Sequence, residues 1–337
     1  MRLSESLKKN IIETTAGKIL NKFKIKKRRN VLFFEDILAI YVKECEKAGF
    51  GKEMRNIAKR WMNLGVKKAV PDVIKKLPST IFFNMILKNM WTNLGIMDDL
   101  KFLKKGSIIT IKTKNETITR IIGKNDFSIG CFSGILNTLF NSEVRCVEAL
   151  QSKKSSKYIF ELKNEPFNTE GKNKEEYNRL NYLSKINGCT LTDALKNKIF
   201  QLKGKNRIYF RGKRLSIVEN TIFHLTGNRG ILLDKVPHIS YDFFEQIIEK
   251  DSTDERKLVL LKTLLQTMGW GIIKISYRNK KIILIEIKNP PYGFQLEKDN
   301  WDFLIQAILG YFWLLDKDFK LVNIDSSYKQ LNIIYHK

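Results

Sequence analysis

The feature that most constrains this chain is a segment that it contains twice. The run GKNDFSIGCFSGILNTLFNSEVRCVEAL at 123–150 returns in altered form as EKDNWDFLIQAILGYFWLLDKDFKLVNI at 297–324. At an offset of 173 residues, apolar side chains recur in both copies in one stripe along a helix, with Asp126 and Asp299 where its cap is expected. A repeat of this length exceeds a solenoid unit of roughly 20 to 50 residues, so it predicts a duplicated domain.

Similar elements are expected around each copy of the repeat. In the first half these are helices within 3–23 and 35–94, a hairpin over 106–123 turning at Lys114 and Asn115, a helix at 129–140, and strands at 143–150 and 157–163. In the second half they are a helix within 190–202, strand structure over 207–219, helices within 241–268, a hairpin over 271–288, a helix at 301–315, and strands at 319–324 and 330–336. We therefore predict an α+β fold of two tandem domains, 1–163 with a basic N-terminal helix and 191–337, joined by a polar linker at 164–190.

The charge of the chain is large and positive. Its 337 residues contain 61 Lys and Arg against 35 Asp and Glu, a net charge of +26. Such a charge attracts polyanions or anionic lipid headgroups, although a general bias toward lysine also produces it. The sequence has no apolar run long enough to cross a bilayer, and its N-terminus lacks an apolar signal core, so we expect a cytoplasmic protein without a transmembrane segment. The four cysteines form no C-x-x-C pair and are expected to be buried thiols.

Residues 109–162 resemble the 4-vinyl reductase domain family, also described as predicted hydrocarbon-binding domains. The family pattern is a hairpin, a helix with a small-residue segment, a strand ending E-x-x-C and a final C-x-F strand. Gly130, Gly134, Glu148 and Phe160 match this pattern. The family's cysteines are replaced by Gln151 and Tyr158, and in the second copy Asn323 replaces the Glu and Ser326 the first cysteine. The resemblance covers about 29–163 and 205–336, the second copy being the more divergent.

The resemblance implies that helices pack on an antiparallel sheet in each domain, as in the similar folds of vesicle-tethering subunits and haem-based nitric-oxide sensors. Members of this group commonly pair, so two copies in one chain imply an intramolecular pseudo-dimer, present as a monomer or within a larger homo-oligomer. Members also hold an apolar ligand, and aromatic residues crowd around the repeated helix in both copies. We therefore expect a non-enzymatic protein, sensory or scaffolding, that binds a hydrophobic small molecule or lipid. The expected ligand-binding residues are Phe127, Cys131, Phe132, Ile135, Cys146, Glu148, Phe294 and Trp301.

Catalytic and metal sites have weak sequence support. The lost cysteines remove the thiolates that a soft metal would need, and His224, His238 and His336 lack metal-binding spacing, so we expect neither a metal nor a cofactor. A metal-dependent nuclease built on Glu148, Glu161 and Lys163 is the third function considered, because restriction-type nucleases use an E-x-K pair on a strand. The same alternation is typical of any half-exposed strand.

The alternative to a ligand-binding protein is a basic scaffold or transcription regulator that associates with nucleic acid or with an acidic protein partner. The densest basic run supplies the candidate phosphate contacts, Lys24, Lys26, Lys27, Arg28 and Arg29. The segment 181–200 also has the helix, Gly turn and helix arrangement of a helix-turn-helix. In the duplicated-domain interpretation, however, it holds the first helix of the second domain.

Overall fold

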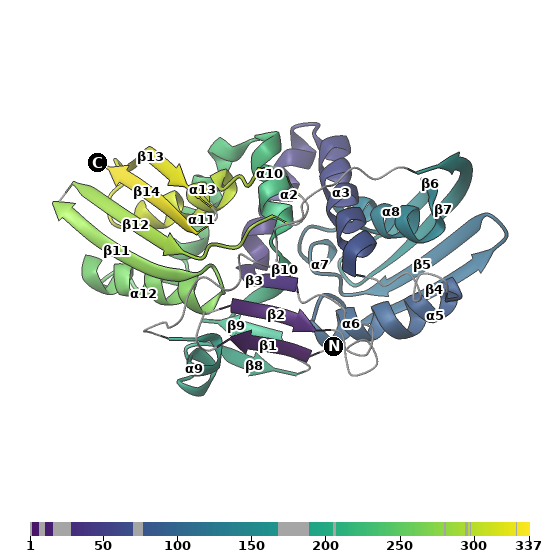
Figure 1. The fold of residues 1–337 in the computed structure, drawn as a ribbon, viewed down its shortest axis with the longest axis horizontal. Coiled ribbons are helices and arrows are strands. Elements are labelled where there is room, and N and C mark those ends of the chain that lie inside the picture. The colour runs from purple at the N-terminus through teal and green to yellow at the C-terminus, as the bar shows by residue number, and fades with distance from the viewer. Residues whose placement is uncertain are drawn as a thin grey trace.

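The structure is a computed structural model that describes residues 2–6, 11–15, 28–69, 77–167, 189–204, 207–279, 281–293, 296, 298–327 and 329–337. Its strands form three antiparallel sheets with helices packed against them, which confirms the predicted α+β class. The molecule is elongated, with a four-stranded sheet at each end and a six-stranded sheet between them (Figure 1). Within the described ranges, no helix combines the length and the apolarity needed to cross a bilayer.

The first four-stranded sheet belongs to the first half of the chain. Its order is β4 (Asp99–Lys105), β5 (Ile108–Lys114), β7 (Ser155–Pro166) and β6 (Ser142–Gln151). Apolar and polar residues alternate along β5, so Ile109 and Ile111 are buried while Lys112 and Lys114 are exposed. On the buried side lie α8 (Asp126–Phe140), α3 (Gly51–Ala69) and the continuous run α5 (Ser79–Ile81), η1 (Phe82–Leu87) and α6 (Lys88–Asn93).

The second four-stranded sheet has the same strand order. Its strands are β11 (Ile272–Asn279), β12 (Ile282–Lys288), β14 (Gln330–His336) and β13 (Lys320–Ser326), in that spatial order. Here too a helix, α13 (Asp302–Phe312), separates two hairpins in the chain, and α11 (Val236–Glu245) and α12 (Asp254–Thr267) precede the first hairpin. The repeated sequence is therefore matched by a repeated topology of hairpin, helix and hairpin.

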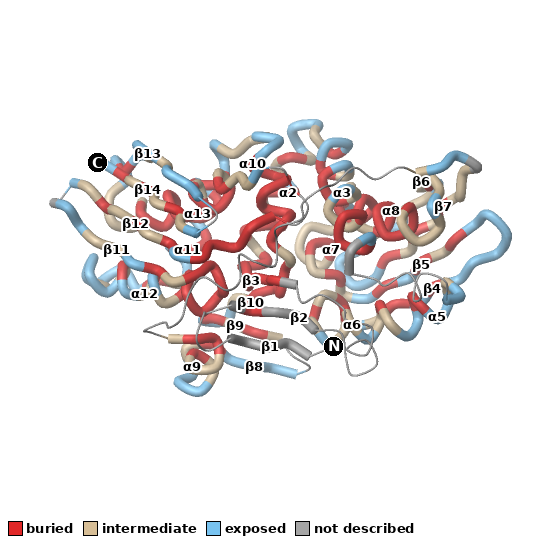
Figure 2. Tube along the Cα trace, in the orientation of Figure 1, coloured by how far each residue is buried: buried red, intermediate tan, exposed pale blue. Residues whose placement is uncertain are grey.

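The central sheet joins the two halves. Its order is β1 (Arg2–Ser6), β2 (Ile11–Thr15), β3 (Arg28–Phe34), β10 (Lys213–Glu219), β9 (Arg207–Phe210) and β8 (Gln201–Lys203). β3 and β10 pair antiparallel at the middle, and each leads into a helix, α2 (Glu35–Lys47) after β3 and α10 (Thr221–Arg229) after β10. α2 packs on α11 of the second half, and α10 packs on α3 of the first. Each half thus packs one helix against the other half, and Figure 2 shows α2 and α8 mostly buried.

Small residues bring the repeated helix close to its neighbour in both halves. A Cβ added at Gly130 or Gly134 of α8 would lie 2.2 Å from the carbonyl oxygen of Arg55 or Lys59 in α3. A Cβ added at Gly310 of α13 would lie 2.1 Å from the carbonyl oxygen of Pro237 in α11. These approaches leave no room for a methyl group, so glycine is required at the crossing.

Two arginines link the central strands to the opposite halves. Arg29 of β3 is buried, and its guanidinium donates to Asn289 Oδ1 at 3.0 Å, Asn289 O at 2.6 Å and Pro290 O at 3.0 Å, with a longer bond of 3.4 Å to Gly269 O. Arg214 of β10 donates to the carbonyl of Gly95, which follows α6 as Gly269 follows α12. Arg214 also pairs with Glu35, at 3.1 Å, and Arg120 pairs with the same carboxylate. Burial, together with the smaller effect of repulsion from Arg214, lowers the pKa of Arg120 to about 10.

Three expectations from the sequence are wrong in detail. Residues 2–6 and 11–15 form the hairpin β1–β2 in place of the predicted N-terminal helix, because β-branched residues at 11–15 favour a strand. The hairpin expected to turn at Lys114 and Asn115 lies one strand earlier: β5 pairs with β4, and 119–122 form the short helix α7 (Thr119–Ile122). Asn125, not Asp126, caps α8, and its side chain accepts from Ser128 N. Asp299 lies before α13 and accepts from Gly293 N.

Candidate functional site

A partly open cavity of about 90 Å³ lies beside α8, where the first half meets β10. One turn of α8 supplies Phe127, Cys131 and Phe132, and β10 supplies Ile217 and Val218 from the second half of the chain. The remaining walls come from α2, α3, α6 and the segments 96–97 and 116–118. These elements contribute Leu38, Trp61, Met62, Trp91, Ile96, Met97, Glu116, Thr117 and Ile118. Ser128 and Ser216 are the small polar residues of the lining. The cavity thus lies at the boundary between the two halves, and both halves contribute to its walls.

A hydrogen-bonded carboxyl group lies at the polar edge of this cavity. Glu116 is buried, and its oxygens accept from the hydroxyls of Thr113, Thr119 at 2.6 Å and Tyr158 at 2.7 Å. Thr119 Oγ1 lies 3.0 Å from Ser128 Oγ, so the network reaches a residue that lines the cavity. Among the described residues, no Lys, Arg or His forms an ion pair with Glu116.

Burial controls the protonation of the groups around the cavity. It raises the pKa of Glu116, because three neutral hydroxyl donors compensate the charged carboxylate less well than water does. It also raises the pKa of the Cys131 thiol, and the nearby Glu116 carboxylate adds to this shift. Cys131 is therefore a neutral, weakly polar wall residue at physiological pH, unlike a reactive thiolate.

Gln151 and Tyr158 extend this network. Gln151 Nε2 donates to Tyr158 OH at 3.1 Å and to Asn125 O at 3.0 Å, and Gln151 Oε1 accepts from Asn125 N at 3.0 Å. The two positions that carry cysteines in the resembled family are therefore neighbours in space and are joined by a hydrogen bond. The bonds between Gln151 and Asn125 connect the edge strand β6 to the N-cap of α8.

The structure brings together three of the eight predicted ligand-binding residues, Phe127, Cys131 and Phe132. Ile135 is fully buried in the core between α8 and the sheet and does not line the cavity. Cys146 and Glu148 lie on β6 outside it; Cys146 Sγ donates to Glu148 O at 3.5 Å, and Glu148 pairs with Lys157 at 3.4 Å. Trp301 packs edge-on against His224 with ring centroids 4.5 Å apart. Phe294 lies outside the described residues.

The equivalent place in the second half is almost filled. A hollow of about 30 Å³ remains between β3, α12 and α13, and its walls include Phe33, Phe34, Phe244, Trp270 and Tyr311. Phe244 and Tyr311 are in edge-to-face contact at 4.8 Å, and Phe34 contacts Phe243 at 4.7 Å. The second copy of the repeat therefore surrounds a nearly solid core.

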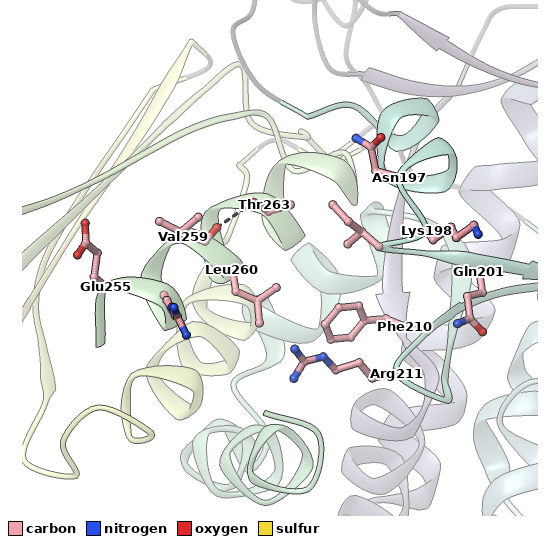
Figure 3. Close-up of a pocket in the computed structure, with 11 residues that line it drawn as sticks. Asn197, Lys198, Gln201, Phe210, Arg211, Glu255, Val259, Leu260 and Thr263 are labelled. Atoms are coloured by element: carbon pink, nitrogen blue, oxygen red, sulfur yellow. Dashed lines mark hydrogen bonds between the residues drawn. The ribbon is translucent and has the colours of Figure 1, made fainter. Parts of the chain in front are cut away.

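A larger surface groove of about 650 Å³ runs between α12, β9 and the segment 197–201 that follows α9 (Leu191–Lys196); we call it the α12 groove (Figure 3). Phe210 and Leu260 form its apolar floor, and Val259 remains 59% exposed at its side. Lys198, Arg211 and Arg256 line it, with Glu255 as its acidic residue. Arg211 reaches Glu249 at 3.5 Å and Ile247 O at 2.7 Å, whereas Lys198 and Arg256 form no ion pair within the part of the chain that is described.

The α12 groove could not be predicted from the sequence. The available signal was an exposed valine within one turn of Arg256 on a predicted helix, which is too common a pattern to mark a site. The groove exists because the segment 197–201 and β9, far from α12 in sequence, lie beside it.

The residues proposed for a nuclease are held in ion pairs. Glu161 pairs with Lys163 at 2.8 Å and with Arg145 at 3.2 Å, and these cations lower the pKa of its carboxyl group. Glu148 pairs with Lys157. Across the described ranges, no three His, Cys, Asp or Glu side chains gather closely enough to hold a metal ion.

The structure describes two of the five predicted nucleic-acid contacts. Lys24, Lys26 and Lys27 lie outside the described residues, and Arg28 begins β3. The prediction that Arg29 contacts phosphates is wrong. Its guanidinium is buried against Asn289 and Pro290, because the strand that carries it is central to the sheet. Residues 181–188 lie outside the description, and α9 is followed by the strand β8.

Comparison of the sequence with protein-family models and with curated proteins finds no match in either.

Proposed function

We propose that this chain is a non-enzymatic binding protein for a compact hydrophobic molecule, held in the partly open cavity beside α8. The observation that carries the proposal is a partly open hollow with aromatic and aliphatic walls at the junction of the two halves, where close packing would otherwise be expected. Apolar cavities of this kind stay dry and take up small apolar molecules. Phe127, Cys131 and Phe132 would contact the ligand directly.

The size of the cavity restricts the ligand. A volume of about 90 Å³ is far below the roughly 300 to 1,000 Å³ of pockets for drug-sized molecules. A long acyl or isoprenoid chain would have to displace side chains, whereas a small ring or a short branched alkane or alcohol would not. Met62 and Met97 in the wall are flexible side chains that can adjust to a somewhat larger guest.

The repeated topology supports the wider proposal that the chain is a tandem, intramolecular pseudo-dimer similar to the 4-vinyl reductase family. The support consists of the shared strand order, the exchange of α2 and α10 between halves, and the arginines that reach across. Tethering the copies in one chain would remove the concentration dependence of their assembly. The nearly solid second core would then leave a structural role to the second copy.

Native mass spectrometry of the purified protein, followed by thermal unfolding with a panel from benzene and short branched alcohols to fatty acids, tests this proposal. We expect small apolar compounds to raise the unfolding temperature. Cys131→Leu, which fills the cavity, should abolish that shift, and Cys131→Ala, which widens it, should keep it. A protein that is empty and unresponsive to every compound, or a Cys131→Leu variant that responds as the parent does, would overturn the proposal.

The α12 groove favours a second, lipid-like ligand with an acidic headgroup. Its floor is apolar, and Lys198 and Arg256 lie at positions where a carboxylate or phosphate could bind while a chain lies over Phe210 and Leu260. Val259→Glu and Arg256→Glu should weaken binding of fatty acids without affecting small neutral compounds. If only the Cys131→Leu change affects fatty acids, the groove is not their site.

A further inference from the structure

The outer face of the first sheet carries an unusual arrangement of lysines, which we call the lysine face. Lys101, Lys112 and Lys157 lie directly opposite one another across β4, β5 and β7. Residues directly opposite in antiparallel strands share a face, and neighbouring strands are about 4.8 Å apart. The lysine face is made up of Lys101, Lys105, Lys112, Lys114, Arg145, Lys157 and Lys163, with the acidic residues Asp99, Glu148 and Glu161.

The acidic residues neutralise the lysine face only in part. Each of the three already has a cation: Asp99 pairs with Lys88 at 2.6 Å, Glu148 with Lys157, and Glu161 with Lys163 and Arg145. Among the described residues, Lys101, Lys105, Lys112 and Lys114 form no ion pair. Like charges directly opposite in a sheet oppose folding, so this row is kept at some cost in stability.

Exposed aliphatic side chains lie among these lysines. Leu103 is 57% exposed, Ile108 40%, Val147 54% and Leu150 56%, and all four belong to this sheet. Leu150 lies opposite Lys157, and Leu103 is two residues from Lys101 along β4. A face that mixes unpaired lysines with exposed aliphatic groups differs from an ordinary solvated sheet, which carries polar side chains outward.

The second sheet provides an internal comparison. In its corresponding row, Lys274 lies opposite Glu286, which lies opposite Asn332, which lies opposite Asp325. Glu286 occupies the place on β12 that Lys112 occupies on β5, three residues before the positive-φ Asn289 or Asn115. The same fold can therefore balance the charge of this row, and the lysine row is a property of the first half.

We propose that the lysine face docks onto an anionic lipid bilayer. Lysines near such a surface gain attraction from its negative potential, and aliphatic side chains gain by entering the headgroup region. A nucleic acid would satisfy the lysines but would leave Leu103, Ile108 and Val147 unused. Single strands are bound through aromatic stacking, and the exposed large apolar residues of this sheet are all aliphatic. This inference is independent of the proposed ligand cavity.

Co-sedimentation with phosphatidylcholine vesicles, with and without phosphatidylglycerol, tests the proposal on the full chain. We expect binding to the anionic vesicles alone, falling as salt is raised. Each lysine removed should weaken binding roughly fivefold, so Lys101→Gln with Lys112→Gln should weaken it by more than about tenfold. The control Lys274→Gln with Lys320→Gln, on the second sheet, should change it less than about twofold.

A second variant separates a membrane from a nucleic acid. Leu103→Ser with Leu150→Ser keeps every charge and should weaken vesicle binding, most clearly at high salt, because the aliphatic contribution is not screened. Equal binding to neutral and anionic vesicles, equal loss in the control pair, or tight salt-sensitive binding to duplex DNA without vesicle binding would each overturn the proposal. Lys101, Lys112, Leu103 and Leu150 are all exposed, so circular dichroism should show an unchanged fold in both double variants.

Discussion

The two four-stranded sheets share a strand order but differ in what lies on each side of them. Behind the first sheet, α8 adjoins a cavity edged by a buried glutamate, and on its outer face lysines lie opposite one another. Behind the second, aromatic side chains nearly fill the equivalent space, and the outer row alternates in charge. The features common to both are the glycine contacts at the helix crossing and an arginine that reaches across. Backbone architecture thus depends on a few close contacts, while interiors and outer faces can diverge.

The hydrophobic cores differ in the same way. One large cluster unites the second half with the central strands and α2, whereas the core under the first sheet is a separate, smaller cluster around Phe102, Phe132 and Phe160. The cavity lies between these clusters, since residues of both line it. Variants at equivalent positions in the two halves can therefore show which differences matter.

The largest effect is expected at the arginines. Arg29→Met should lower the free energy of unfolding by about 4 kcal/mol, because it leaves buried carbonyls of Asn289 and Pro290 without a donor. Arg214→Met should cost about 2 kcal/mol, because Glu35 keeps Arg120 and the repulsion between the two arginines is relieved. Urea denaturation measures both, and equal losses would show that the two crossings are energetically alike.

The next effect is expected at the helix crossings. Gly134→Ala and Gly310→Ala should each cost about 2 kcal/mol, since the added methyl would press on a backbone carbonyl and force the helices apart. Thr138→Ala is the control on α8, because its hydroxyl donates to Gly134 O within the same helix. If only the first-half glycine variant is destabilised, the crossings are not equivalent in the way that the topology indicates.

A smaller effect is expected in the pH dependence of the free energy of unfolding, and it comes from Glu116 in the first half. Burial raises the pKa of Glu116 in the folded state, so its stabilising contribution is fully present below its unfolded pKa and is lost as pH rises through the folded value. Urea denaturation from acid to neutral pH should therefore show a decline that Glu116→Gln lacks. An identical pH profile in parent and variant would mean that Glu116 does not titrate in this range.

The smallest effect is expected on the outer faces. Lys112→Glu should stabilise the protein by about 0.5 kcal/mol, because it places a carboxylate between Lys101 and Lys157. Glu286→Lys, at the equivalent place, should destabilise it by about as much, because it puts a like charge opposite Lys274. Thermal unfolding at low salt measures both changes, and high salt should reduce them. Changes of the same sign in both sheets would contradict the difference in charge balance between their outer rows.

Several features of the fold could be predicted from the sequence because they depend on the local periodicity of apolar residues. The stripe of apolar residues that contains Phe132 and Ile135 predicted the repeated helix, and β-branched runs predicted the strands that follow each copy. Further repetition was available: LKNMWTNLG at 87–95 is matched by LKTLLQTMG at 261–269, and both end at the glycine whose carbonyl accepts from a crossing arginine. This repetition identifies equivalent positions in the two halves, but it does not identify the arginine that each glycine carbonyl binds.

The candidate site was predictable only in part. Phe127, Cys131 and Phe132 were found because they lie on the repeated helix, but Ile217 and Val218 could not be, since β10 reaches the cavity from about 85 residues further along the chain. Glu116 was also missed, because a glutamate among threonines predicts an exposed turn, whereas the hydroxyls of Thr119 and Tyr158 allow its burial.

The sequence by itself determined that this protein is an α+β chain with a strongly basic composition and a repeated segment, and where its repeated helix lies. The tertiary structure alone decided that Arg29 is a buried link between halves, that residues 2–6 and 11–15 pair as strands, and that a hollow remains beside one helix but hardly beside the other. The reason is physical: periodicity records which face of an element is buried, but the residues that bury it come from distant parts of the chain.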